Sequence, residues 1–216
     1  MPIVEYRVEL VRLAELRPHE DVDRGHVAEI ARSLARIGVL YRPVIVEEET
    51  NTIIDGHHRI EALKLLGARY APVVRASYNR DIAGIQAPVR RICLEAATPE
   101  DALYRAASLV EEGLERGPSR IMLRSGAHTA VLRGSLYSIY NVIDSLERKL
   151  ARPNACQGVL LIPEPLNRDA ILGAALEGLL YPRKSSIHVT SLKKLYHPVK
   201  LRLLEDGVPR ALRSQV

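Results

Sequence analysis

The chain lacks phenylalanine and tryptophan altogether, and it contains only two cysteines. Its nine tyrosines therefore supply all of the aromatic bulk. Hydrophobic residues make up 47% of the 216 residues, which is enough for a core that needs no disulfide or metal to fold. Cys93 and Cys156 lie far apart and outside any Cys-x-x-Cys spacing. We expect them to pack in the interior, not to build a disulfide framework or a thiolate metal site.

Long hydrophobic runs are also missing. No stretch approaches about eighteen uncharged apolar residues, and charge appears from Glu5 onward. These absences predict neither a membrane-spanning helix nor a secretory signal peptide, so we expect a cytoplasmic protein. The formal net charge of +5 suits an anionic partner, such as a nucleotide, a phosphorylated metabolite or nucleic acid. Asn and Gln are scarce and ionic residues are plentiful, which is typical of thermophilic sources and also of GC-rich genomes.

The hydrophobic pattern predicts an α/β (α+β) protein. Apolar residues recur at helical spacing from His26 to Ile37, and Gly38 ends that helix. A second helix is expected to begin with Asp55 as its N-cap and to end near Leu66. Strands are expected at Val4–Val11, Pro43–Val46, Thr52–Ile54 and Ala71–Ala76, the middle two as a hairpin.

The second half opens with Thr98 and Pro99, which are typical of a helix start. Further helices are expected at 136–150 and 167–180, and strands at 121–124, 129–132, 158–162, 186–190 and 199–204. We therefore predict two domains: residues 1–90 bind a nucleotide, and residues 91–216 form an α/β domain that binds the substrate.

The segment Asp55–Arg59 reads Asp-Gly-His-His-Arg and joins a buried strand to a helix. Backbone N–H groups of a first helical turn have no intrahelical partner, and the helix dipole places partial positive charge there. Gly56 lets an anion approach the backbone, His57 and His58 add donors, and Arg59 adds a planar fork suited to phosphate. This pattern predicts a phosphate site at the start of the helix.

Asp55 is the unusual member of this segment, because a carboxylate repels a neighbouring phosphate. A Mg²⁺ ion held by Asp55, or a polarised substrate hydroxyl, would remove that conflict. The alternative is that Asp55 only caps the helix and that the histidines are solvated. Two histidines and an arginine in one turn favour the functional interpretation.

The order of His19-Glu20, a helix, the strand Pro43–Val46 and then Asp55–Leu63 resembles the ParB/sulfiredoxin-like fold. In that superfamily a Gly-x-x-Arg-x-x-Ala motif holds nucleotide phosphates, and Gly56, Arg59 and Ala62 match it. ParB proteins usually carry Glu-Arg inside the motif, and sulfiredoxins carry a catalytic cysteine. This chain has neither.

The Asp-Gly-His-His-Arg version is similar to that of the archaeal free serine kinases, which transfer a phosphoryl group from ADP or ATP to the hydroxyl of L-serine. Their product, O-phospho-L-serine, feeds cysteine biosynthesis. The resemblance implies that Glu20 is the catalytic base, assisted by Asp55. A serine hydroxyl must lose its proton as it attacks phosphorus, and a positioned carboxylate can accept it. Without the resemblance, a Glu before a helix is usually just solvated.

The resemblance extends to the segment Pro182–His188, which looks like the family's Lys-Ser/Thr-Thr-Arg-His substrate segment. Ile187 stands where that family has Arg. The residues implied to bind the substrate are Lys184, Ser185, Ser186 and His188. The same stretch is also compatible with a polar turn before a strand.

Two other functions compete with the serine kinase. A ParB-like DNA-binding or CTP-switch protein would explain the phosphate motif and the positive charge equally well. Such a protein normally adds a helix-turn-helix, whereas the second half here mixes strands and helices with acidic runs such as Glu111–Glu112. A sulfiredoxin-like reductase would need a cysteine in the motif. Nothing in the sequence distinguishes ADP from ATP as donor, or fixes the oligomeric state.

Overall fold

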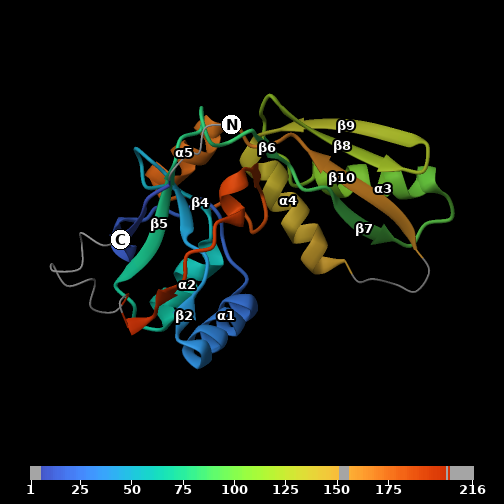
Figure 1. Cartoon of the computed structure of the whole chain (residues 1–216). Helices are drawn as coiled ribbons and strands as arrows, with labels where there is room; N and C mark the ends of the chain where they lie inside the picture. The colour runs from blue at the N-terminus through green and yellow to red at the C-terminus, as the bar shows by residue number, and fades with distance from the viewer. Residues whose placement is uncertain (1–5, 151–155, 203, 205–216) are drawn as a thin grey trace. The chain divides into compact units, whose positions relative to one another are not determined.

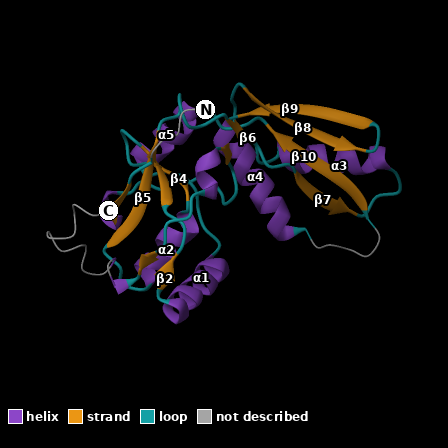
Figure 2. Ribbon diagram, in the orientation of Figure 1, coloured by secondary structure: helices purple, strands orange, loops and turns teal. Residues whose placement is uncertain are grey.

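The computed structural model describes residues 6–150, 156–202 and 204 and has the predicted mixed α/β fold (Figures 1 and 2). It divides into two compact units. The first contains residues 1–84, 168–180 and 188–216, and the second contains residues 85–167 and 181–187. This division differs from the predicted domains, 1–90 and 91–216, because segments late in the chain return to the first unit. None of the described helices is long and apolar enough to cross a bilayer.

The first unit is built on a four-stranded sheet with the order β1-β5-β3-β4. β3 runs parallel to β5, while the β1–β5 and β3–β4 pairs are antiparallel, so the predicted hairpin is confirmed. A small two-stranded sheet, β2–β12, lies apart from it. The elements of this unit are β1 (Val8–Arg12), η1 (Leu13–Glu15), α1 (Arg24–Ile37), β2 (Val39–Leu40), β3 (Val44–Glu47), β4 (Ile53–Asp55), α2 (His57–Leu65), β5 (Tyr70–Ala76), α5 (Arg168–Glu177), η2 (Ser191–Lys194) and β12 (Val199–Lys200).

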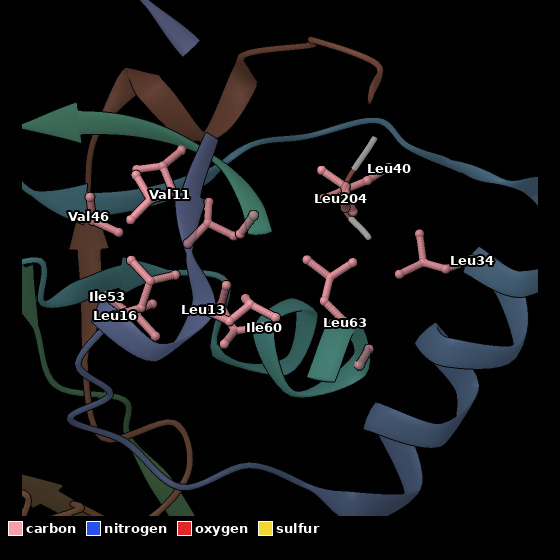
Figure 3. Packing of buried hydrophobic residues seen from close by; sticks show 14 of the residues in the cluster. Val11, Leu13, Leu16, Leu34, Leu40, Val46, Ile53, Ile60, Leu63 and Leu204 are labelled. Carbon is pink, nitrogen blue, oxygen red and sulfur yellow. The ribbon is translucent and has the colours of Figure 1, made fainter. Parts of the chain in front are cut away.

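The core of the first unit lies between its sheet and the helices α1 and α2 (Figure 3). Leu34 of α1, Ile60 and Leu63 of α2 and Ile53 of β4 meet there, with Leu204 from the C-terminal region. Burial of one such side chain contributes about 1.5–3 kcal/mol, so this core fixes α2 firmly on the sheet. As predicted, α1 ends at Gly38, which adopts the left-handed conformation.

The second unit is an antiparallel four-stranded sheet with the order β7-β10-β8-β9. α3 and α4 pack on it around one hydrophobic cluster. The predicted start of α3 is confirmed, since the Thr98 side chain accepts the Asp101 N–H and Pro99 opens the helix. Its elements are β7 (Arg90–Leu94), α3 (Pro99–Glu111), β8 (Ser119–Ser125), β9 (His128–Gly134), α4 (Leu136–Lys149) and β10 (Gln157–Pro163). The short strands β6 (Gly84–Gln86) and β11 (Ile187–Val189) pair with each other.

Three predictions about particular residues need correction or restriction. Cys93 and Cys156 form a disulfide, not two separate packing contacts. Pairing of β7 with β10 explains it, because Gly158 lies opposite Cys93 and so brings the residues just before β10 close to that cysteine. The strand expected at 199–204 extends only over Val199–Lys200. The expected strand from Val4 begins at Val8, and residues 1–5 lie outside the described part of the chain.

Candidate active site

The turn from β4 into α2 forms the expected helix start, with Gly56 and not Asp55 as its N-cap. Asp55 is the last residue of β4, where it lies opposite Ile45. Gly56 has a φ of 113°, and an added Cβ would lie 3.0 Å from Nη2 of Arg59 and 3.1 Å from Val44. The prediction that Asp55 caps the helix is therefore wrong, because the positive φ and the close neighbours reserve this position for glycine.

The first intrahelical hydrogen bond of α2 is donated by the Ile60 N–H to the Gly56 carbonyl oxygen at 3.0 Å. The backbone N–H groups of His57, His58 and Arg59 therefore lie outside the helix's own hydrogen-bond ladder. Together with the helix dipole, they make this turn electropositive. The turn thus has the backbone donors that the predicted anion site requires, and the site itself stays a prediction.

The Arg59 guanidinium is held inside the protein. Its Nη1 donates to the carbonyl oxygens of Arg42 (2.9 Å) and Pro43 (2.6 Å), and its Nη2 is ion-paired with Asp55. Burial lowers the pKa of Arg59, and the charge of Asp55 opposes that shift. The Arg59 guanidinium thus links α2 to the residues just before β3, and it neutralises the Asp55 carboxylate beside the electropositive turn.

This pairing bears on the magnesium site suggested for Asp55. The Asp55 carboxylate is already paired with the partly buried Arg59 cation, and the described residues contain no group of three His, Cys, Asp or Glu side chains that could hold a metal ion. The arrangement does not fit a magnesium site built by the protein. We therefore derive no step through a metal held by Asp55.

His57 and His58 use their rings differently from the prediction. The His57 Nε2 accepts the backbone N–H of His19 at 3.4 Å, and the His58 Nε2 accepts the backbone N–H of Asp23 at 3.1 Å. His57 is buried, and burial holds its pKa well below the ordinary value, so the ring is neutral. Both rings accept hydrogen bonds through Nε2 from the segment between Pro18 and α1, so Nε2 is not available as the predicted phosphate donor.

Glu20 lies in that same segment, immediately after His19. Glu20 and His57 line one cavity of about 500 Å³ in the first unit. Its lining includes two cations, Arg24 and Lys64, and two further carboxylates, Asp21 and Glu61, of which Glu61 is ion-paired with Lys64 at 2.7 Å. The predicted base and the first residue of α2 thus line the same cavity, which is large enough for a small molecule.

The buried imidazoles of His19, His57 and His188 lie next to one another beside the segment that carries Glu20. The His19 ring makes edge contacts with the rings of His57 and His188, with centroids 4.6 Å and 5.9 Å apart. His188 is also hydrogen-bonded to the Tyr78 hydroxyl at 2.9 Å. Burial lowers the pKa of His19 to about 4 and that of His188 to about 3. Sequence reasoning placed His188 in a substrate segment, but the ring is buried in the first unit and faces His19 and Tyr78.

The other predicted substrate residues belong to the second unit. Ser185 is buried and its hydroxyl donates to the Pro182 carbonyl oxygen, so it stabilises its own turn. Lys184 is exposed and lines a cavity of about 690 Å³ with Arg90, Arg91 and other residues. Ser186 is half-buried. A substrate role for Lys184 and Ser186 stays a prediction.

Residues 2–86 match the model of the ParB N-terminal domain, so the region carrying the electropositive turn and Glu20 has the ParB/sulfiredoxin-like fold that the motif predicts. The match ends close to the point where the chain leaves the first unit.

The chain is also similar in sequence to archaeal L-serine kinases. It is 31% identical over 75 residues to the ADP-dependent L-serine kinase SerK of Thermococcus kodakarensis, an alignment that covers 33% of this chain and 31% of that protein. A ParB-like protein of Sulfolobus acidocaldarius is similar over more of the chain, with 27% identity over 193 residues, 85% of this chain and 91% of the relative.

Solved structures with the same fold cover nearly the whole chain. A free serine kinase in complex with AMP superposes with a TM-score of 0.70 at 19% identity, over 94% of this chain and 95% of that one. SbnI of Staphylococcus aureus, truncated at its C-terminus, superposes with a TM-score of 0.76 at 17% identity, over 96% and 93% of the two chains. At these identities the likeness establishes the fold, including that of the second unit.

Proposed function

We propose that this protein is a free L-serine kinase that transfers the terminal phosphoryl group of ADP or ATP to the hydroxyl of L-serine. The observation that carries the proposal is the cavity lined by both Glu20 and His57, the first residue of α2. Glu20 is a carboxylate able to accept a proton, and His57 belongs to a backbone turn able to hold phosphate. The homology to L-serine kinases and the fold of an AMP-bound free serine kinase support it.

In the proposed reaction, the nucleotide phosphates lie against the backbone N–H groups at the start of α2. Gly56 permits their close approach, and the dipole of α2 stabilises their charge. Arg59 keeps the Asp55 carboxylate neutralised, so that this neighbour does not repel the phosphates. Asp55 thus acts through Arg59.

Glu20 then takes the proton of the serine hydroxyl as the oxygen attacks the terminal phosphorus. The bond between that phosphorus and the bridging oxygen breaks, and AMP or ADP leaves with the bridging oxygen's negative charge. The two products are the nucleotide shortened by one phosphate and O-phospho-L-serine, which would feed cysteine biosynthesis. Any Mg²⁺ carried by the nucleotide phosphates enters as part of the substrate.

A ParB-like DNA-binding function is the second candidate, and one observation favours it: the relative matched over 85% of the chain is a ParB-like protein. Against it stands the second unit. Its described residues form an antiparallel sheet with two packed helices, an arrangement without the helix-turn-helix that reads a DNA groove.

One experiment separates the two functions. The purified protein is incubated with L-serine, Mg²⁺ and either ADP or ATP, and O-phosphoserine is measured by mass spectrometry, with L-threonine and L-homoserine as alternative acceptors. We expect phosphoserine with at least one donor. Duplex DNA binding at sub-micromolar affinity that weakens steeply with salt, without any phosphoserine, would instead support the DNA-binding function.

A further inference from the structure

The two histidines of the electropositive turn contact the segment that carries Glu20 at both of its ends. Nε2 of His57 accepts the N–H of His19, and Nε2 of His58 accepts the N–H of Asp23. The two hydrogen bonds therefore bracket residues 20–22. Because His57 and His58 are the first two residues of α2, both bonds originate from the same turn that offers its backbone N–H groups to an anion.

Each end of the segment is fixed by a second set of contacts. At one end, the His19 ring is buried against the rings of His57 and His188. At the other end, the Asp23 carboxylate accepts the His26 N–H at 3.0 Å and so caps α1. The backbone on either side of Glu20 thus has little freedom, and its position relative to α2 depends on the two imidazoles.

An imidazole nitrogen that accepts an N–H carries no proton of its own. In each ring the proton must then sit on Nδ1, and neither Nε2 can donate to a phosphate while its bond to the segment persists. The rings therefore cannot hold this segment and donate to a phosphate through Nε2 at the same time. In the structure, both Nε2 atoms hold the segment.

We propose that His57 and His58 are positioning residues, whose acceptor nitrogens hold the Glu20 segment at a fixed distance from the phosphate-binding turn of α2. The inference rests on the proposed kinase function and deepens it. It explains why two adjacent histidines occupy a turn where donors would have been expected. Proximity of the base to the attacking hydroxyl then depends on two backbone-to-imidazole hydrogen bonds.

The test compares substitutions that keep or remove the acceptor. His58→Gln retains an acceptor oxygen at a similar reach, whereas His58→Leu removes it and keeps a side chain of similar bulk. His57→Gln and His57→Leu form the same pair at the buried position. His128→Leu, at an exposed histidine of β9 in the second unit, controls for loss of an imidazole as such.

Two readouts are needed. Hydrogen exchange of the peptide covering residues 19–23 reports on the hydrogen bonds themselves, whether or not the protein is a kinase. Steady-state kinetics with L-serine, and the Kd for ADP or ATP, report on their consequence. We expect His58→Leu to speed exchange of this peptide, to lower kcat about 10- to 100-fold and to leave the nucleotide Kd within about twofold. His58→Gln should restore both, and His128→Leu should change neither.

Opposite results would overturn the inference. If His58→Leu weakens nucleotide binding without accelerating exchange at residues 19–23, the ring contacts the phosphates directly. If His58→Leu and His58→Gln lose activity equally, the acceptor is not what matters. If the wild-type protein makes no phosphoserine, the proposed function fails, and the exchange comparison alone still decides whether the histidines hold the segment. A ¹⁵N spectrum of the histidine side chains should show Nδ1-protonated tautomers for both rings.

Discussion

The buried histidines of the first unit make a quantitative prediction about acid stability. Burial lowers the pKa of His19 to about 4, of His188 to about 3 and of His57 well below its ordinary value. In the unfolded chain each of these groups has the ordinary value of 6.5. Between the unfolded and folded values the unfolded state binds more protons, so the free energy of unfolding falls as the pH drops below about 6.5.

The magnitude follows from the size of this window. Well below its unfolded pKa, a histidine that is protonated only when unfolded lowers the free energy of unfolding by about 1.4 kcal/mol per pH unit, which integrates to about 2 kcal/mol between pH 7 and pH 5. His19 and His188 together should remove about 4 kcal/mol, and His57 acts in the same direction. An ordinary Asp or Glu, with a pKa of about 4, stays mostly ionised at both pH values and contributes less.

The assay is urea unfolding followed by circular dichroism at pH 7 and pH 5, at constant ionic strength. We expect the first unit to lose about 4 kcal/mol or more over this range. In a His188→Gln variant the pH-dependent loss should shrink by about 2 kcal/mol. His128→Gln, which replaces an exposed histidine, should leave the loss unchanged. A difference below about 1 kcal/mol in the wild-type protein would refute the account of a neutral, buried histidine layer.

Two further predictions concern local features of the fold, a glycine at a positive φ and the disulfide. Gly56→Ala should cost about 3 kcal/mol in a thermal or urea unfolding experiment, because φ is 113° and the new Cβ would meet Arg59. Gly67→Ala, also at a positive φ but with nothing within 4 Å of the new Cβ, should cost only about 1–2 kcal/mol, and equal costs would contradict this argument. Cys93→Ser should lower the unfolding free energy of the second unit by about 2–4 kcal/mol, since the disulfide to Cys156 closes a sequence separation of 63 residues. A reducing agent should have the same effect on the wild-type protein and none on the variant.

Local signals in the sequence predicted the elements well. Gly38 ends α1, Thr98 and Pro99 open α3, and β3 and β4 form a hairpin, each as the residues indicate. These features depend on interactions between neighbours in sequence, such as a cap or a turn. The pairing of β5 between β1 and β3, and the return of α5 to the first unit, depend on contacts between residues far apart, which periodicity does not report.

The disulfide likewise depends on a contact between residues far apart in sequence, so local signals could not predict it. Cys93 and Cys156 have no informative spacing, and only the register of β7 against β10 brings them together. The N-cap of α2 was predicted wrongly for a different reason. Asp is preferred over Gly at N-caps in general, but this turn needs a positive φ, which Gly56 adopts and Asp55 would not.

For the candidate site, the motif Asp55–Arg59 correctly marked an electropositive helix start, and the resemblance drew attention to Glu20. The directions of the side chains could not be predicted. Histidine can accept or donate, and only the positions of the His19 and Asp23 N–H groups show that His57 and His58 accept. The burial of His188 beside Tyr78 was missed for the same reason, since its partner lies far away in sequence.

The central claim is that Glu20 removes the proton of the acceptor hydroxyl beside a phosphate held by α2. The most direct measurement is phosphoserine formation by Glu20→Gln, together with its Kd for ADP and ATP. Glu61→Gln, which alters the second glutamate of the same cavity, is the matched control. We predict that Glu20→Gln binds nucleotide like the wild-type protein but loses at least about a hundredfold in kcat, while Glu61→Gln stays active. Full activity of Glu20→Gln would contradict the account.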